Sequence, residues 1–438
     1  MNTHFDNPPT LGQLTRASAR IGFLSFGGPA GQIALMHREL VEERGWLGEQ
    51  DYLQALNLCH LLPGPEAQQL ATWIGWKLHG WKGGIIAGGL FVLPGAAVML
   101  ALSMLYGLAA NLEWFAALFL GIKAAVLAII AQALVRVAGR ALKTGTQKIL
   151  AALAFTALFL FDVPFPAVVV AALLLGAIIG KLRPSMLALA HREPASTSIF
   201  QPWAASIGAV LVWGVIWAAP MVVIAITLGP DHRLWKIGAF FSQLAVVTFG
   251  GAYAVLSYMA QEAVAGYGWL APGEMADGLG LAETTPGPLI MVTQFVGYLA
   301  ALRAPEPFSP LVAGLLGAGL TTWVTFAPCF LWIFALAPWM EHLQRLRSLQ
   351  GGLAAVTAAV VGVIANLAVW FALHVLFRRV ASVQAGPLHL QVPDPATLDW
   401  RAAVIAGFAA WLIFRLGRGI AFSLALCALA GLALGRVG

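Results

Sequence analysis

The chain has 438 residues, of which 60% are hydrophobic and only 10% are charged, and its formal net charge is +6. Ordinary soluble domains carry about 25% charged residues, so this composition excludes a soluble globular protein. The positive charge is spread over the connecting segments of an apolar chain, which indicates the lipid bilayer as a partner and not a nucleic acid.

Apolar segments near or above the roughly 20 residues that span a bilayer recur along the chain. The clearest cover residues 83–108, 114–135, 203–228 and 310–337. Residues 1–11 are polar and contain no apolar core typical of a signal peptide. We therefore predict an all-α polytopic membrane protein with about 13 membrane segments.

The chain repeats itself at a shift of 223 residues, which places Ser25 on Thr248. Without a gap, Phe-Gly-Gly at 26–28 then falls on the same tripeptide at 249–251. Gly-Trp-Leu and Pro-Gly-Pro recur at the same shift, over about 40 residues in all. Identities of this density predict two homologous halves.

Each half is predicted to contain the same elements in the same order. A broken amphipathic region comes first, followed by a polar connector, a second broken region, two long apolar helices and a pair of shorter helices. The short pair covers 149–161 and 165–181 in the first half, and 402–415 and 420–434 in the second. We therefore divide the chain into a first repeat (1–182), a linker (183–202), an extra transmembrane helix (203–230) and a second repeat (231–438).

The extra helix has no counterpart in the first half, and one added span turns the second repeat upside down if each repeat crosses an even number of times. Basic residues concentrate in cytoplasmic loops. The turn of the first short pair contains Asp162, whereas the equivalent turn carries Arg415 and Arg418. This change of sign predicts an inverted repeat with a cytoplasmic N-terminus. Six basic residues stand against it: Arg233, Lys236, Arg303, Arg378, Arg379 and Arg401.

The broken regions are rich in residues that interrupt helices. Gly27, Gly28 and Pro29 cannot sit comfortably inside one continuous helix, and neither can Pro-Gly-Pro at 63–65. Such a break at membrane depth is tolerated only where the backbone is buried in protein or lines a polar cavity. Broken helices of this kind build the substrate sites of many secondary transporters. Pro65 suits the start of a new helix, predicted over 66–79, whose N-terminus would point at the break.

Six motifs carry a resemblance to a known family: Phe-Gly-Gly-Pro at 26–29, Arg-Gly-Trp at 44–46, Leu-Pro-Gly-Pro-Glu at 62–66, Gln-Gln-Leu-Ala at 68–71, Thr-Phe-Gly-Gly at 248–251 and Thr-Pro-Gly-Pro at 285–288. Over essentially the whole chain, the sequence resembles the long two-domain form of the chromate ion transporter family. The resemblance implies an inner-membrane carrier that exports chromate and confers chromate resistance, sometimes associated with sulfate. The second half departs from the first at Ala252 and Leu289, which replace Pro29 and Glu66.

Chromate is a tetrahedral dianion, close to sulfate in shape, and its site needs donors on several sides together with positive potential. Helix N-termini and glycine-rich backbone supply both. The alternative is that the glycines only permit close helix packing. The expected substrate-binding residues are Gly27, Gly28, Pro29, Pro63, Gly64, Pro65, Glu66, Lys123, Gly250, Gly251, Pro286, Gly287 and Pro288.

Two ionisable residues in this set have competing interpretations. Lys123 lies in the middle of a long apolar segment, where a charge is costly and marks a functional candidate. It either balances the charge of the substrate or extends toward the nearer membrane interface. Glu66 either suits the helix dipole or carries a proton, because an ionised carboxylate beside a dianion would repel it.

Other polar groups rank below these residues. Arg16 and Arg20 share a helix face, where they either gather anions or anchor the chain. Trp46 and Trp269 are expected to be interfacial anchors. Four further groups lie near the breaks: His60, Gln68, Gln69 and Gln294.

The function predicted from these observations is secondary transport of chromate outward by alternating access. Sulfate or another oxyanion as substrate, and an anion channel, remain alternatives, and a homo-oligomer is open. No enzyme, catalytic residue, metal site or cofactor is expected. The three cysteines are isolated, no phosphate-binding loop occurs, and no haem, flavin or iron–sulfur pattern is visible.

Overall fold

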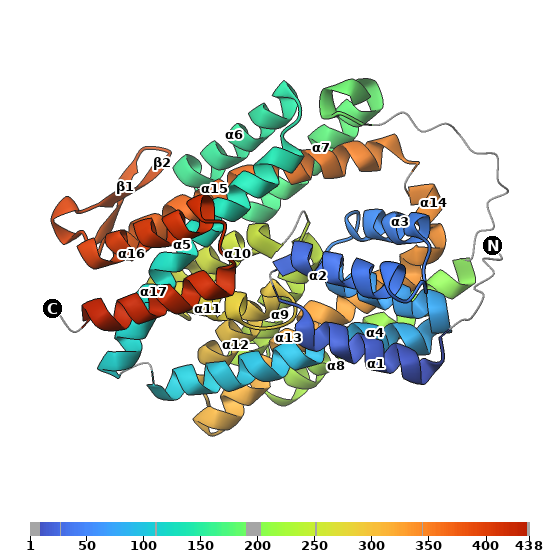
Figure 1. Ribbon diagram of the computed structural model, residues 1–438, viewed down its shortest axis with the longest axis horizontal. Coiled ribbons are helices and arrows are strands. Elements are labelled where there is room, and N and C mark those ends of the chain that lie inside the picture. Colours follow the sequence, from blue (N-terminus) through green and yellow to red (C-terminus); the bar gives the residue numbers. More distant parts are fainter. Residues whose placement is uncertain are drawn as a thin grey trace. The chain divides into compact units, whose positions relative to one another are not determined.

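The computed structural model describes residues 9–26, 28–109, 112–189, 203–249, 252–343 and 345–435. Most of these residues are helical, which confirms the all-α class (Figure 1). The chain divides into two compact units, and each unit takes segments from both halves of the sequence. Unit 1 comprises Met1–Leu102, Glu193–Ala252 and Thr285–Arg345, and unit 2 comprises Ser103–Arg192, Tyr253–Thr284 and Leu346–Gly438.

Unit 1 contains both Pro-Gly-Pro segments and the extra helix predicted from the sequence. Its helices are α1 (Leu11–Leu24), α2 (Gly28–His37), η1 (Arg38–Glu42), α3 (Glu49–Cys59), most of α4 (Glu66–Ala109), α8 (Trp203–Thr227), α9 (Arg233–Val247), η4 (Leu289–Met291), α12 (Val292–Leu302), α13 (Pro310–Leu336), η5 (Ala337–Trp339) and α14 (Met340–Leu343).

Unit 2 contains the two short helix pairs and the long helices that precede them. Its helices are α5 (Glu113–Ala141), α6 (Gly145–Phe161), α7 (Phe165–Leu182), η2 (Pro184–Leu187), α10 (Ala252–Gln261), η3 (Glu262–Gly266), α11 (Pro272–Thr284), α15 (Arg347–Leu376), η6 (Pro395–Thr397), α16 (Trp400–Ala410), η7 (Trp411–Arg415) and α17 (Ile420–Gly435).

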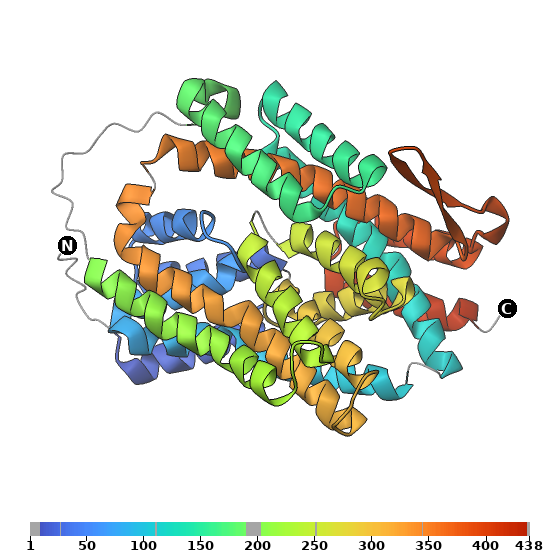
Figure 2. The same ribbon diagram turned by 180° about the vertical axis from the view of Figure 1, so that it is seen from behind.

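The short helices and the extra helix lie where the sequence predicts them. Helices α6 and α7 meet at Asp162, which adopts a left-handed conformation that ends α6. The extra helix, α8, lies along α13, where the Trp323 indole N–H donates to the Ile216 carbonyl at 2.9 Å (Figure 2). Six of the described helices are long and apolar enough to cross a membrane, so the protein is an integral membrane protein.

Helix α4 is continuous in sequence but reverses direction within its length. His79 and Gly80 leave the helical region, and Gly80 has a φ of 60°. A Cβ on Gly75 would lie 2.1 Å from the Gly83 carbonyl oxygen, so the two arms of α4 pack against each other at the glycines. The first arm ends at the predicted boundary. At about 1.5 Å per residue, it is too short to cross a bilayer by itself.

The repeat is visible in the backbone of the two connectors. Gly45 and Gly268 have φ values of 61° and 59°. The Trp46 N–H donates to the Leu40 carbonyl at 2.9 Å, and the Trp269 N–H donates to the Ala263 carbonyl at 2.7 Å. These bonds are related by the same shift of 223 residues, so the repeated sequence adopts a repeated conformation.

The long helices of unit 2 pack crosswise between the halves of the sequence. Helix α5 of the first half lies against α17 of the second, and α15 of the second half lies against α7 of the first. A Cβ on Gly121 would stand 1.9 Å from the Cys427 carbonyl oxygen. A Cβ on Gly351 would stand 2.4 Å from the Gly176 carbonyl oxygen. Small residues at both crossings allow the backbones to approach closely.

The sequence did not lead us to predict one element, a β-hairpin. Strands β1 (Val380–Ala385) and β2 (Leu388–Pro393) form an antiparallel hairpin that turns at Gly386, with a φ of 61°. The strands are short, β1 is mostly exposed and β2 is half-buried, so they lack the apolar length by which the other elements were recognised. A glycine between two short alternating runs is the signal that predicts such a hairpin.

Candidate functional site

The first break of each half ends a helix in the same way. Helix α1 ends before Ser25, whose hydroxyl donates to the Ile21 carbonyl at 2.6 Å. Helix α9 ends before Thr248, whose hydroxyl donates to the Leu244 carbonyl at 2.5 Å. Both residues are buried. Their hydroxyls bond back to the preceding turn, which leaves their own carbonyl oxygens available beyond the helix end.

Those carbonyl oxygens are used by the Pro-Gly-Pro segments in a crossed pattern. The Gly64 N–H donates to the Thr248 carbonyl at 2.8 Å, and the Gly287 N–H donates to the Ser25 carbonyl at 2.9 Å. Each Pro-Gly-Pro glycine therefore binds the first break of the other half. The φ values are 117° for Gly64 and 88° for Gly287, a region that favours glycine. The crossed bonds satisfy backbone groups that the breaks would otherwise leave unpaired.

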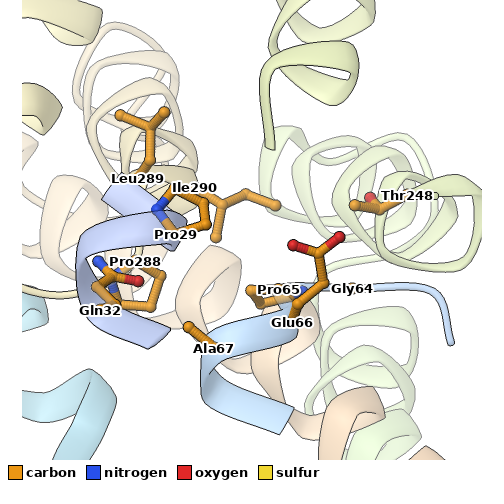
Figure 3. A pocket seen from close by; sticks show the side chains of 10 residues that line it. All are labelled: Pro29, Gln32, Gly64, Pro65, Glu66, Ala67, Thr248, Pro288, Leu289 and Ile290. Carbon is orange, nitrogen blue, oxygen red and sulfur yellow. The ribbon is translucent and has the colours of Figure 1, made fainter. Parts of the chain in front are cut away.

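A pocket opens between these breaks in unit 1. Figure 3 shows the Glu66 carboxylate projecting into the space between Ile290 and Thr248. The pocket has a volume of about 10 Å³, close to the room that one water molecule needs. A tetrahedral oxyanion is larger, so the pocket must widen to hold one. The lining residues are Pro29, Gln32, Gly64, Pro65, Glu66, Ala67, Thr248, Pro288, Leu289 and Ile290.

Three helix starts contribute to this lining. Helix α2 begins beside Pro29, α4 begins at Glu66, and η4 leads into α12 after Pro288. The first turn of each helix has N–H groups without an acceptor inside the helix. Residues 65–67 and 288–290 are equivalent by the internal repeat, so two related N-termini meet at one pocket. Their dipoles make it a favourable place for an anion.

The polar side chains of the pocket come mostly from the first half. The Gln32 amide donates to the Gly287 carbonyl at 2.6 Å and to the Ser25 carbonyl at 3.4 Å. Glu66 is 13% exposed and lies 3.3 Å from the Nδ1 atom of His60. The second half places Leu289 where the first has Glu66. The site is therefore related by the repeat in its backbone but not in its side chains.

Several residues predicted from the sequence meet at this pocket. Pro29, Gly64, Pro65, Glu66 and Pro288 line it. Gly287 lies behind it, where its carbonyl accepts from Gln32.

The remaining residues of the two Pro-Gly-Pro segments and of the first break support the pocket from outside. Pro63 accepts a 2.6 Å hydrogen bond from the Gln69 amide. The Pro286 carbonyl oxygen faces Gly95, whose added Cβ would lie 2.4 Å away. Gly28 has a φ of 69° and open space around its Cβ position. Gly27, Gly250 and Gly251 lie outside the described residues.

Lys123 lies elsewhere, in unit 2, and has a carboxylate partner. Its Nζ atom is 3.3 Å from Oδ2 of Asp277 on α11. The same oxygen accepts a 2.7 Å hydrogen bond from the Tyr106 hydroxyl. The side chain is therefore held by an ion pair, which neither of the two interpretations drawn from the sequence included.

Three residues at or near these sites were missed by sequence reasoning. Thr248 was visible only as the counterpart of Ser25, and its role depends on its carbonyl oxygen. Gln32 was a polar residue just beyond the first break, and this position was the available signal. Within α11, Asp277 is the one charged residue of the run 275–282, which was a signal for a buried partner of Lys123.

The lower-ranked groups have structural partners. Arg20 pairs with Glu39 at 3.2 Å, and Glu39 is fully buried. Arg44 lies 5.1 Å from the centre of the Trp46 ring. The Gln294 amide donates to the Ala96 carbonyl at 3.1 Å. These contacts connect segments of unit 1 around the breaks.

Comparisons with known proteins agree over most of the chain. A family model described as chromate transporter matches residues 12–180 and 235–433. The chain is 31% identical over 423 residues to the chromate transport protein of Pseudomonas aeruginosa, and the match covers 93% of each chain. It is 30% identical over 410 residues to the probable chromate transport protein of Synechococcus elongatus, across 92% of this chain and 96% of the relative.

A third relative is the chromate transport protein of Cupriavidus metallidurans, 30% identical over 373 residues and 81% of each chain. No solved structure matches this chain.

Proposed function

Because this chain belongs to the chromate transporter family, we propose that it carries chromate out of the cell across the inner membrane and so confers chromate resistance. The family is a transport family, and its relatives in Pseudomonas aeruginosa and Cupriavidus metallidurans are named chromate transport proteins. The observation that carries the assignment of the site is the pocket at which helix starts from both halves meet.

A dianion suits this pocket for two physical reasons. The unpaired N–H groups of α4 and of the η4–α12 segment supply hydrogen-bond donors from two directions. The paired helix dipoles supply positive potential without a buried lysine or arginine, which would need its own counter-charge when the site is empty. The Glu66 carboxylate opposes this positive potential. Anion binding therefore depends on the balance between the two, which allows the anion to be released.

The membrane potential favours the outward direction. Moving one elementary charge through 100 mV is worth about 2.3 kcal/mol, so a dianion that leaves an inside-negative cell gains roughly twice that amount. Uptake of the same ion would need coupled cations or protons. Export is therefore the direction that the energetics support.

The narrow pocket supports a carrier over an open pore. Its volume of about 10 Å³ is too small to hold a tetrahedral oxyanion. The substrate must enter after the breaks separate on one side and leave after they separate on the other, which is alternating access.

The test is chromate flux into inverted membrane vesicles that contain the protein, with an imposed membrane potential. Saturable uptake that rises with an inside-positive potential supports the proposal. Equal uptake by vesicles without the protein contradicts it, and large unitary currents in a planar bilayer would replace the carrier with a channel.

Sulfate is the second candidate substrate, because backbone donors recognise the shape and charge that both ions share. Flux of radiolabelled sulfate with chromate as competitor separates the two. Inhibition of sulfate flux at chromate concentrations below those of sulfate supports chromate as the preferred ion.

We also propose that the N-terminus is cytoplasmic and that the two halves are inverted. In a variant without Cys59, Cys329 and Cys427, single cysteines at Asp162 and Arg415 should react with an impermeant reagent from opposite faces of the membrane. Labelling of both from the same face rules out the inversion.

A further inference from the structure

Helix α11 of unit 2 carries two buried carboxylates that the pocket does not use. Asp277 is 3% exposed and Glu283 is 8% exposed. Asp277 faces Lys123 of α5, as described above, and Glu283 accepts a 2.7 Å hydrogen bond from the Tyr253 hydroxyl. An ionisable side chain buried in a membrane protein is costly and marks a functional site.

Asp277 is satisfied on one side only. Its Oδ2 atom takes both the Lys123 ammonium and the Tyr106 hydroxyl. Its Oδ1 atom is buried and has no hydrogen-bond partner among the described residues. A buried ion pair needs hydrogen bonds on all its lone pairs to offset the loss of hydration. The unpaired Oδ1 atom leaves the hydrogen bonding of this ion pair incomplete. Among the described residues, no oxygen of Glu283 is both buried and without a hydrogen-bond partner.

The pair is not part of the repeated framework. At the shift of 223, the position equivalent to Asp277 in the first half is Gln54. Further along, the shared pattern Gly-x-x-Ala-Ala-Val at 121–126 and 351–356 aligns Lys123 with Leu353. Because the corresponding positions lack both charges, the repeat does not need this pair in order to fold. The pair joins one residue of each half, Lys123 from the first and Asp277 from the second.

The surroundings of Asp277 contain few other charges. Glu274 on the same helix acts on it electrostatically, besides Lys123 and Tyr106. Helices α15 and α17 also pack against α11. Helix α15 carries titratable side chains only at its ends, Arg347 and His374, and α17 carries only Cys427. Lys123 is therefore the charged partner that lies directly against Asp277.

We propose that Asp277, held by Lys123 and Tyr106, is a proton-binding site that couples inward proton movement to outward chromate movement. The inference rests on the proposed transport function. In the step, the Asp277 carboxylate takes one proton at an oxygen and becomes a neutral carboxylic acid, and Lys123 keeps its charge. The neutral acid can donate a hydrogen bond, which a carboxylate cannot. Release of the proton to the cytoplasmic side restores the pair.

This coupling adds to the drive for export. One proton that enters while one dianion leaves moves three charges with the membrane potential. The ion pair supplies the switch. Protonation of Asp277 converts a neutral pair into a single, partly buried cation on Lys123 and so changes the charge between α11 and α5.

The experiment uses the full-length protein in liposomes that contain a pH-sensitive dye, with a clamped membrane potential. For the wild type, chromate efflux should be accompanied by proton influx, and an inward proton gradient should stimulate efflux. Asp277→Asn should lose both the proton influx and the stimulation, while potential-driven chromate efflux continues. Glu283→Gln is the matched control, a buried carboxylate on the same helix with a tyrosine partner, and it should keep both.

The single variant leaves Lys123 without its counter-charge, so the double variant Lys123→Gln with Asp277→Asn is measured beside it. Removing both charges avoids a partly buried cation without its partner. A monodisperse elution profile in detergent verifies folding. The double variant should also lose proton coupling.

Each other outcome overturns a distinct claim. Wild-type chromate efflux without proton influx overturns this inference and leaves the proposed function standing. Full proton coupling in the folded double variant, or loss of coupling in Glu283→Gln as well, overturns the assignment to Asp277. A wild type that moves no chromate overturns the proposed function, and the inference with it.

Discussion

The two Pro-Gly-Pro breaks make the same backbone hydrogen bond but carry different side chains. Gly64 and Gly287 make the same crossed hydrogen bond, at 2.8 and 2.9 Å, to equivalent carbonyls of the opposite half. The first half supplies Glu66 and Gln32 to the pocket, whereas the equivalent sequence positions of the second half hold Leu289 and Val255. The backbone geometry is therefore duplicated at the pocket, while a side chain of the first half sets its charge.

The strongest test of the shared backbone is Gly64→Val beside Gly287→Val. A Cβ on Gly64 would stand 2.9 Å from the Cys329 sulfur, and its φ of 117° is unfavourable for a branched side chain. Strain of about 1–3 kcal/mol at the crossed bond should reduce chromate flux about tenfold or more. Both variants should show this loss in vesicle flux measurements.

The matched control for these variants is Gly45→Val in the connector. Gly45 has a φ of 61° but open space at its Cβ position, so it adds backbone strain away from the pocket. Its flux per folded molecule should stay near that of the wild type. Normal flux for Gly287→Val would show that the second break has no part in the site.

The crossed helix packing of unit 2 gives the next largest effect. Gly121→Ala and Gly351→Ala place a methyl group against backbone atoms of α17 and α7, at 1.9 and 2.4 Å. Each should lower the stability by about 1–3 kcal/mol, because neither helix can move away without losing its other contacts. Thermal unfolding in detergent measures this loss.

Gly139→Ala is the control for the packing variants, because it lies on α5 with open space at its Cβ position. It should be neutral or slightly stabilising, since alanine favours a helix over glycine. A large loss at Gly121 with none at Gly351 would mean that the two crossings are not equivalent.

A smaller effect is expected from the charge that distinguishes the breaks. Glu66→Gln removes a negative charge from the pocket, so chromate should bind severalfold more tightly, as measured by quenching of intrinsic tryptophan fluorescence. Leu289→Gln adds a polar group of similar size at the equivalent position without changing charge, and its affinity should change less. Weaker binding by Glu66→Gln would instead assign Glu66 a direct role in holding the anion.

The smallest effect concerns the two connectors, which lie outside the six candidate spans. In the first, the pKa of His37 is raised above 6.5 by its hydrogen bond to Glu49, while burial opposes the shift, and the charges of Glu49 and Glu42 raise it further. The equivalent position in the second half is Ala260. Because the folded state binds the proton more tightly, the His37 contribution is complete below pH 6.5 and is lost as the pH rises through the raised pKa.

His37→Gln should therefore lower the unfolding temperature at acidic pH and converge with the wild type at alkaline pH. Unfolding scans over that range measure the difference. A difference that grows toward alkaline pH would contradict the sign of the shift.

The sequence was sufficient for the elements but not for their partners. Short helices such as α6 and α17 were predicted closely, because apolar runs and breaker residues act locally. Lys123 was recognised as unusual, yet its partner Asp277 lies more than a hundred residues away and no local rule connects them. Strands β1 and β2 were missed because their pattern is short and weakly apolar.

What the sequence by itself determined was the membrane class, the two related halves, the broken helices and the candidate residues at the breaks. These follow from composition, repetition and the steric limits of glycine and proline, which are properties of neighbouring residues. Only the tertiary structure decided that each glycine of Pro-Gly-Pro bonds to the opposite half, that two helix starts share one pocket and that Lys123 faces a carboxylate. The reason is physical: a buried polar group must find a partner, and the choice of partner depends on which helices the fold brings together.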